Sequence, residues 1–133
     1  VNWINTSLDP PDQAIDYTTL REWYAQSLAV CIPLSGDAND TCGYTNMLEA
    51  MAMRKPVIMT RSGSLHINPK DQKFGYLVEP QDTEGWTHTM EEVINNPAEN
   101  EHLGTEGRRI AENEFSIEKF EQKLLGFLKD ILA

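Results

Sequence analysis

The chain has 133 residues, of which 40% are apolar and 24% are charged, and its formal net charge is −10. Such a length and composition are typical of one globular domain and leave no room for two. The acidic excess argues against nonspecific binding to nucleic acid or to anionic lipid, because both need clustered Lys and Arg, whereas a small anionic ligand held by backbone N–H groups stays compatible with it.

The first elements that the sequence predicts are a short strand and an amphipathic helix. The strand falls on residues 2–4, and a loop with two adjacent prolines separates it from the helix. Apolar residues recur at helical spacing from Leu20 onward, so we expect the helix over residues 19–27. Thr19 and Glu22, three residues apart, would form its capping box.

A strand–helix–strand unit follows. The continuous apolar run at residues 28–33 predicts a strand buried on both faces, as in a parallel sheet, with Cys31 as a core thiol. A loop rich in Gly, Asp and Asn leads to a helix over residues 45–54, and Pro56 begins a second buried strand over residues 56–60. The unit is a βαβ motif, whose two strands run parallel.

The rest of the chain predicts one more strand and three helices. Residues 75–79 have the apolar character of a strand. Asp82 or Thr83 would cap the next helix, Pro97 would open another, and Ser116 would cap the last.

This alternation of strands and helices predicts an α/β fold, a Rossmann-like doubly wound parallel sheet with helices on both faces. In such sheets, ligands bind beyond the carboxyl ends of the strands. Two loops leave strand ends there, residues 34–44 and 61–69, so we expect the functional site between them.

The stretch at residues 40–56 is the most informative for function. Gly43 lets the backbone turn tightly just before the helix, so the backbone N–H groups of residues 44–46 would face outward at the helix start and, with the helix dipole, form an anion site. Glu49, one turn further on, is placed to accept hydrogen bonds from sugar hydroxyls, although a solvated or capping-region glutamate is the more ordinary interpretation of the residue by itself. The expected buried stripe of this helix is Leu48, Met51 and Ala52.

Several stretches resemble the signature of the group 1 (family 4) retaining glycosyltransferases, and they occur in the right order. The stretch LEAMAMRKPVIMT at residues 48–60 resembles the end of the family's Glu-x7-Glu motif and the EAMA-x-G-x-PVI text after it. The other matching stretches are residues 20–33, GYLVEPQD at residues 75–82, LGTEGRR at residues 103–109 and the Phe115-Ser116 pair. Each stretch is unspecific alone, but the ordered set is specific.

The resemblance implies the C-terminal half of a GT-B fold, in which two Rossmann-like domains face each other across a cleft. Residues 1–133 would be a single nucleotide-sugar-binding domain that lacks its first strand or strands and the N-terminal acceptor domain. The full-length protein would be a hexosyltransferase that uses a nucleoside-diphosphate sugar, such as a UDP-sugar, without a metal or other cofactor. We expect it in the cytoplasm, peripheral to the membrane and without a transmembrane segment, and we expect no catalysis by the fragment alone.

The resemblance also implies donor-binding residues, though no catalytic one within this chain. Glu49 matches the second Glu of the family motif, which contacts the nucleotide ribose. Neighbouring residues match, or lie beside, the loop whose backbone N–H groups meet the donor phosphate and sugar. These further candidates are Gly43, Tyr44, Thr45, Asn46 and Leu48.

Two positions depart from the family pattern. Thr41 stands eight residues before Glu49, where the family has its first Glu, and Asp40 is the adjacent donor-site candidate that could take that role. Arg54 stands where the family has Gly, so the left-handed end of the helix must form without glycine.

Other functions stay open from the sequence. The departures at Thr41 and Arg54 favour a degenerate, non-catalytic GT-B domain that acts in assembly or regulation. A receiver-like module would need an acidic cluster after the first strand, which the start of the chain does not offer. Arg61 and His66 lie in the second loop, where a donor contact and a plain surface position are both open, and the three His and two Cys residues show no metal-ligand spacing.

Overall fold

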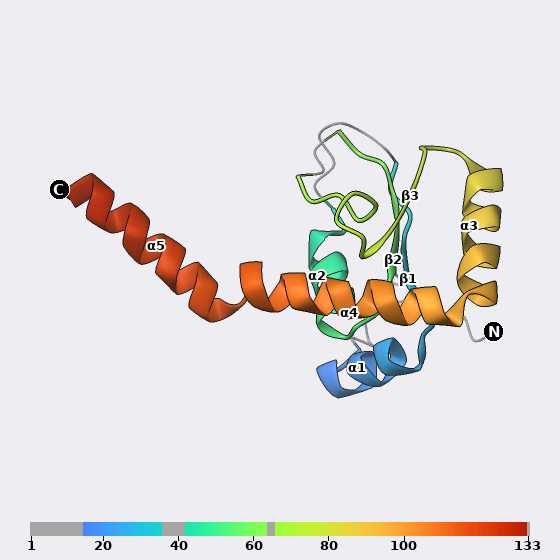
Figure 1. Ribbon diagram of the computed structural model, residues 1–133, viewed down its shortest axis with the longest axis horizontal. Coiled ribbons are helices and arrows are strands. Elements are labelled where there is room, and N and C mark those ends of the chain that lie inside the picture. Colours follow the sequence, from blue (N-terminus) through green and yellow to red (C-terminus); the bar gives the residue numbers. More distant parts are fainter. Residues whose placement is uncertain (1–14, 36–41, 64–65, 133) are drawn as a thin grey trace.

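The computed structural model of the protein describes residues 15–35, 42–63 and 66–132, which form helices and strands in alternation. In chain order the elements are α1 (Tyr17–Gln26), β1 (Val30–Ile32), α2 (Tyr44–Ala52), β2 (Val57–Thr60), β3 (Gly75–Val78), α3 (Thr83–Asn95), α4 (Pro97–Glu114) and α5 (Ile117–Leu132) (Figure 1). The strand predicted at residues 2–4 lies outside the described residues, and the other predicted elements are present.

The three strands form one parallel sheet in the order β1-β2-β3. Val30 of β1 lies opposite Val57 of β2, which in turn lies opposite Gly75 of β3. The central strand β2 is buried along its whole length, as its apolar run predicts. The predicted βαβ unit is therefore confirmed, with α2 as the crossover between β1 and β2.

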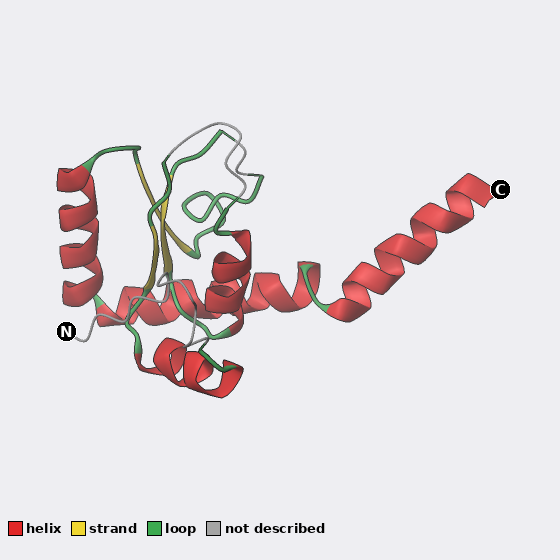
Figure 2. Cartoon of the chain, turned by 180° about the vertical axis from the view of Figure 1, so that it is seen from behind, coloured by secondary structure: helices red, strands yellow, loops and turns green. Residues whose placement is uncertain are grey.

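Helices cover both faces of this sheet. Side chains alternate along β2, so Val57 and Met59 pack in the core cluster with α2 and α4, while Ile58 packs with Val93 of α3 on the other face. In Figure 1, α2 and α3 stand on opposite sides of the strands, and Figure 2 shows the same layers from behind. The predicted Rossmann-like, doubly wound α/β fold is thus confirmed.

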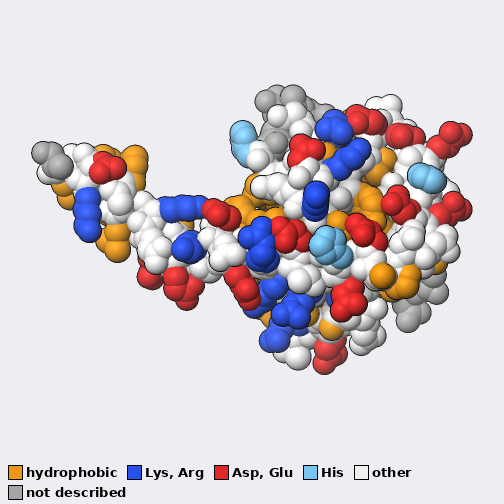
Figure 3. Space-filling model, viewed as in Figure 1, with side chains coloured by type: hydrophobic (Ala, Val, Ile, Leu, Met, Phe, Trp, Pro, Cys, Tyr) orange, Lys and Arg blue, Asp and Glu red, His pale blue; other side chains and the backbone are white. Residues whose placement is uncertain are grey.

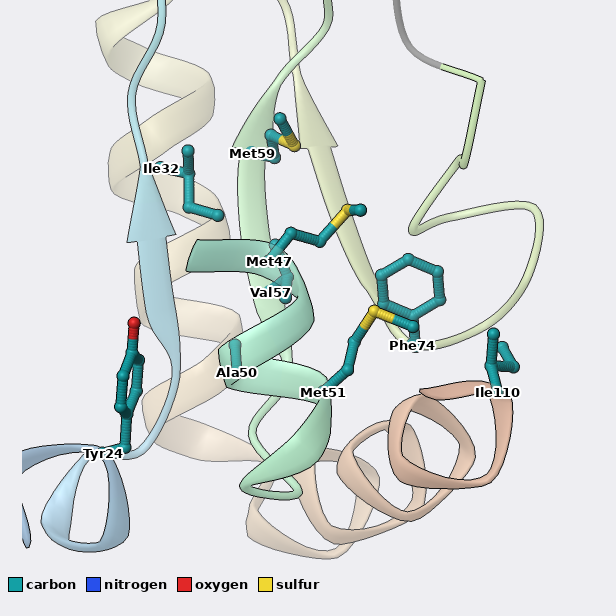
Figure 4. Packing of buried hydrophobic residues seen from close by; sticks show 9 residues of the cluster. All are labelled: Tyr24, Ile32, Met47, Ala50, Met51, Val57, Met59, Phe74 and Ile110. Carbon is teal, nitrogen blue, oxygen red and sulfur yellow. The ribbon is translucent and has the colours of Figure 1, made fainter. Parts of the chain in front are cut away.

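One face of α2 forms the centre of the larger cluster (Figure 4). Met47, Ala50 and Met51 are fully buried against the sheet. The predicted stripe of Leu48, Met51 and Ala52 is wrong for its first and last members, which are only partly buried. The reason is that the i, i+3, i+4 face that meets the sheet begins one residue earlier, at Met47.

The C-terminal end of α2 forms without glycine, as the sequence requires. Arg54 has a φ of 56°, in the left-handed region. The Lys55 N–H donates to the Ala50 carbonyl at 2.9 Å, and the Arg54 N–H donates to the Met51 carbonyl at 3.1 Å. These two bonds make a Schellman motif, so the departure from glycine at Arg54 costs strain but does not prevent the helix end.

Helix α4 packs closely against this same end. A Cβ on Gly104 would overlap the backbone carbonyl of Arg54, so only glycine allows the approach. Arg108 then donates through Nη1 to the Ala52 carbonyl at 2.6 Å, which satisfies a carbonyl at the end of α2. The stretch LGTEGRR therefore has a structural role in joining the two helices.

The start of α1 differs from the prediction. Asp16, not Thr19, is the N-cap, and its Oδ1 accepts hydrogen bonds from the N–H groups of Thr18 and Thr19 at 2.9 and 3.0 Å. The Thr19 hydroxyl itself donates to Asp16 Oδ2 at 2.8 Å. The predicted capping box is wrong because an aspartate three residues earlier already satisfies these donors.

The core position expected for Cys31 is also wrong, because this residue is exposed. Of the three residues of β1, only Ile32 is buried. Cys31 lies opposite Ile58 in register and so points to the face that carries α3, but α3 packs against β3 rather than β1. Strand β1 forms an edge of the described sheet, which explains why it is not buried on both faces.

Helix α5 extends away from the domain as an arm and packs only against the end of α4 among the described elements (Figure 1). Ser116 caps it as predicted, since its Oγ accepts from the Lys119 N–H at 3.3 Å. No residue of α5 is buried, and apolar side chains lie exposed along the arm (Figure 3). None of the helices in the described ranges combines the length and apolar character that a membrane span needs.

Candidate functional site

The start of α2 lies against the carboxyl ends of β1 and β2. Gly43 precedes the helix with a φ of 87°, a conformation that only glycine adopts without strain. A Cβ at this position would stand 2.6 Å from Ile32 Cγ2 and 3.3 Å from Met59 Cε. Both the turn and the close approach of the helix to the strand ends therefore require glycine here.

Two hydrogen bonds hold the loops that leave these strands, one to the end of β2 and one to the start of α2. The Leu34 N–H donates to Thr60 Oγ1 at 2.9 Å, and the His66 N–H donates to the Tyr44 hydroxyl at 2.8 Å. Thr60 is buried at the end of β2. The segments after both strands thus meet beside the start of α2, and His66 reaches this place through its backbone.

The first turn of α2 presents backbone N–H groups at this edge of the sheet. The N-cap residue, Gly43, has no side chain that could cap the helix, and the Met47 N–H donates to the Gly43 carbonyl at 2.9 Å. Thr45 and Asn46 in the first turn are exposed. Their N–H groups and the positive end of the helix dipole form a surface that suits an anion such as phosphate.

Glu49 lies one turn along α2, where Tyr24 of α1 holds its carboxylate. The Tyr24 hydroxyl donates to Glu49 Oε2 at 2.8 Å. Burial, followed by the hydrogen bond to Glu49 and the charge of Glu49, raises the pKa of Tyr24 to about 12, against a smaller opposing effect of the Asn46 side chain. The hydroxyl therefore stays protonated at neutral pH and remains a donor to Glu49.

Tyr24 belongs to this site although the sequence does not indicate it. A tyrosine on the core-facing side of an amphipathic helix carries a hydroxyl that needs a partner, and a half-buried carboxylate needs a donor. The hydroxyl that needs an acceptor and the carboxylate that needs a donor were the features from which such a pair could have been suspected. The pairing of Tyr24 with Glu49 could not be found from spacing, because the two residues are 25 positions apart on different helices.

The remaining candidate residues do not all lie at this edge of the sheet. Leu48 packs against the core cluster, so its side chain faces the interior rather than the strand ends. Asp40 and Thr41 lie outside the described residues. Arg61 pairs with Glu79, with Nε 2.6 Å from Oε1, and both side chains are exposed. The structure therefore gathers Gly43, Tyr44, Thr45, Asn46 and Glu49 at one edge.

Two hollows of the described surface lie away from this edge. One of about 680 Å³ is lined by residues of β3, α3 and α4, and one of about 510 Å³ lies between residues 71–73 and the end of α4. Neither is lined by residues 43–49. Within the described ranges, no group of three or more His, Cys, Asp or Glu side chains is arranged to hold a metal ion.

Comparison with known proteins identifies the family to which a chain with this fold, and with this candidate site at the carboxyl edge of its sheet, belongs. The profile of the family described as glycosyl transferases group 1 matches residues 12–96, more than half of the chain. The chain belongs to the group 1 glycosyl transferases. The matched region includes all of α2 and therefore every donor-site candidate from Asp40 to Glu49.

Two relatives of this group 1 chain are longer proteins, of which it matches only a part. It is 30% identical over 84 residues to alpha-1,3/1,6-mannosyltransferase ALG2 of Dictyostelium discoideum, a match that covers 63% of this chain and 20% of that protein. The solved structure of sucrose-phosphate synthase from Thermosynechococcus elongatus matches with a TM-score of 0.76 and 25% identity. That match covers 90% of this chain and 29% of the synthase, so the chain spans less than a third of either relative.

Proposed function

We propose that this chain is the donor-binding domain of a retaining glycosyltransferase and that a nucleoside-diphosphate sugar binds at the start of α2. The observation that carries the proposal is the position of Glu49, whose carboxylate lies one turn from an exposed helix N-terminus at the carboxyl edge of a parallel sheet. The diphosphate would accept hydrogen bonds from the N–H groups of residues 43–46, and Glu49 would accept from the ribose hydroxyls. Asp40 would contact the donor sugar.

The transferred group in this proposal is a hexosyl unit, because one relative of the chain is named as a mannosyltransferase. The bond between the anomeric carbon and the diphosphate oxygen would break, and an acceptor oxygen would bond to that carbon with retention of configuration. This domain would contribute by positioning the donor and by stabilising the charge that develops on the diphosphate. The acceptor site and any base would come from a further domain, with no metal or other cofactor.

Calorimetric titration of the chain with UDP, GDP and ADP tests the proposal. We expect one of the three to bind and Glu49→Gln to weaken its binding about tenfold, the loss expected when hydrogen bonds to a charged acceptor weaken. Glu91→Gln, an exposed glutamate on α3, is the matched control and should bind like the wild type. We also expect no glycosyl transfer by the chain alone, so measured turnover would contradict the proposed division of labour between domains.

A non-catalytic domain that serves assembly or regulation is the second candidate, favoured by Thr41 in place of the family's first Glu. Arg54 no longer favours it, because the helix end forms with this residue in the left-handed region. The same titration separates the candidates. Failure of all three nucleotides to bind, both to the chain and to a longer form with its upstream residues, would support the non-catalytic function.

A further inference from the structure

The hydrogen bond between Tyr24 and Glu49 gives the two oxygens of the Glu49 carboxylate different environments. Oε2 accepts from the Tyr24 hydroxyl at 2.8 Å, in a part-buried position between α1 and α2. Oε1 accepts no hydrogen bond from any residue in the described part of the chain. Oε1 is open to solvent, and a carboxylate oxygen with no donor among the described residues can accept a hydrogen bond from a ligand.

The Tyr24 ring is held too firmly for its hydroxyl to follow a moving carboxylate. Tyr24 is only 8% exposed, and its ring packs in the core cluster with Ile32 and Ala50 (Figure 4). The hydroxyl therefore has a fixed position relative to the sheet and to α2. The carboxylate bonded to it loses rotamers before any ligand arrives.

Helix α1 is itself fixed to the far end of α2. Lys55 Nζ donates to the carbonyl oxygens of Ala25 and Ser27 at 2.8 and 2.9 Å, where α1 ends. Lys55 is itself the last residue of the Schellman motif that ends α2. The helix that carries Tyr24 and the helix that carries Glu49 are thus joined by a second contact beyond the hydroxyl–carboxylate bond.

We propose that Tyr24 is a positioning residue for donor binding: its hydroxyl holds Oε2 of Glu49 so that Oε1 is directed to the ribose hydroxyls of the nucleotide. This inference rests on the proposed function and extends it to a residue of α1 that does not touch the donor. A carboxylate fixed in its bound geometry loses less freedom on binding, so the pre-organised site binds more tightly than a mobile one.

The test compares nucleotides with and without ribose hydroxyls on Tyr24→Phe, which keeps the ring and removes the hydroxyl. The probes are whichever of UDP, GDP and ADP binds the wild type and the 2′,3′-dideoxy form of that nucleotide. We expect Tyr24→Phe to lose about five- to tenfold in affinity for the ribonucleotide, the typical effect of one hydrogen bond to a charged group, and less than about twofold for the dideoxy form. In a Glu49→Gln background, Tyr24→Phe should add no further loss.

Tyr76→Phe is the matched control, because the Tyr76 hydroxyl is buried without a hydrogen-bond partner among the described residues and Tyr76 packs on the α3 face. It should bind both nucleotides like the wild type. Equal losses for the two nucleotides in Tyr24→Phe would show a merely structural role and overturn the inference, as would no loss for either. If neither the chain nor the longer form binds any of the three ribonucleotides, the proposed function fails together with this inference. If the wild type binds and prefers the ribose form while Tyr24→Phe matches it, only the inference fails.

Discussion

The carbonyl oxygen of Arg54 occupies the space that a Cβ would need at Gly104, so α4 crosses the end of α2 where only glycine fits. Arg54 is itself strained, with a φ of 56° at the end of α2. The contact therefore requires glycine on α4, whereas the position after α2 tolerates a side chain at the cost of backbone strain. Because α2 carries the candidate donor residues, this contact also sets where the site lies on the sheet.

Gly104→Ala should destabilise the domain strongly. The added methyl group would meet backbone rather than a movable side chain, so α4 must shift away from α2, at a cost of about 2 to 3 kcal/mol in the free energy of unfolding. Urea denaturation followed by circular dichroism measures this change. Gly126→Ala is the control, because a Cβ at Gly126 in α5 meets nothing within 4 Å. Equal stabilities of the two variants would show that α4 does not cross α2 this closely in solution.

Arg54→Gly should stabilise the domain by about 1 kcal/mol, because glycine adopts the left-handed region at the end of a helix without steric cost. Arg54→Ala is the matched control: it removes the same long side chain but keeps the Cβ, so it should bring no such gain. Thermal unfolding of the three proteins decides between them. A gain in the alanine variant as large as in the glycine variant would place the effect in the arginine side chain instead of the backbone.

The stability of the domain should fall between about pH 10 and pH 12 because of Tyr24. In the unfolded chain a tyrosine loses its proton near 10.0, whereas burial and Glu49 keep Tyr24 protonated in the folded state up to about pH 12. The unfolded state therefore binds fewer protons in this range, so the free energy of unfolding decreases as pH rises. Denaturation at a series of pH values should give a shallower decline for Tyr24→Phe. Parallel declines for the two proteins would mean that Tyr24 titrates like a free tyrosine.

The apolar face of α5 should contribute little to the stability of this domain. Phe127 is 63% exposed, so Phe127→Ala should change the free energy of unfolding by less than about 0.5 kcal/mol. Met51→Ala, at a fully buried position, should cost about 2 to 5 kcal/mol in the same urea titration. A cost for Phe127→Ala that approaches the cost at Met51 would show that the α5 face is covered in solution.

The sequence by itself determined the order of elements, the parallel sheet and the edge at which the loops meet. These depend on short-range features: apolar runs such as residues 56–60, the left-handed turn at Gly43 and the helix cap at Asp82, whose Oδ1 accepts from the Gly85 N–H at 2.8 Å. Each feature follows from a few neighbouring residues and their backbone geometry. The resemblance to the family depends on similar local sequence motifs. Some residues of those motifs have a structural role, such as Gly104, which allows α4 to pack against the end of α2.

Only the tertiary structure decided which side chains of distant elements meet. The exposure of Cys31 follows from the place of β1 at the edge of the described sheet, which the apolar run around it does not reveal. The pairing of Tyr24 with Glu49 depends on the packing of Tyr24 of α1 and the buried face of α2 into one core cluster. Periodicity identifies the face that a residue occupies on its own element, but the partner of that face is set by how the elements pack together, so the detailed geometry of the candidate site became visible only in the folded domain.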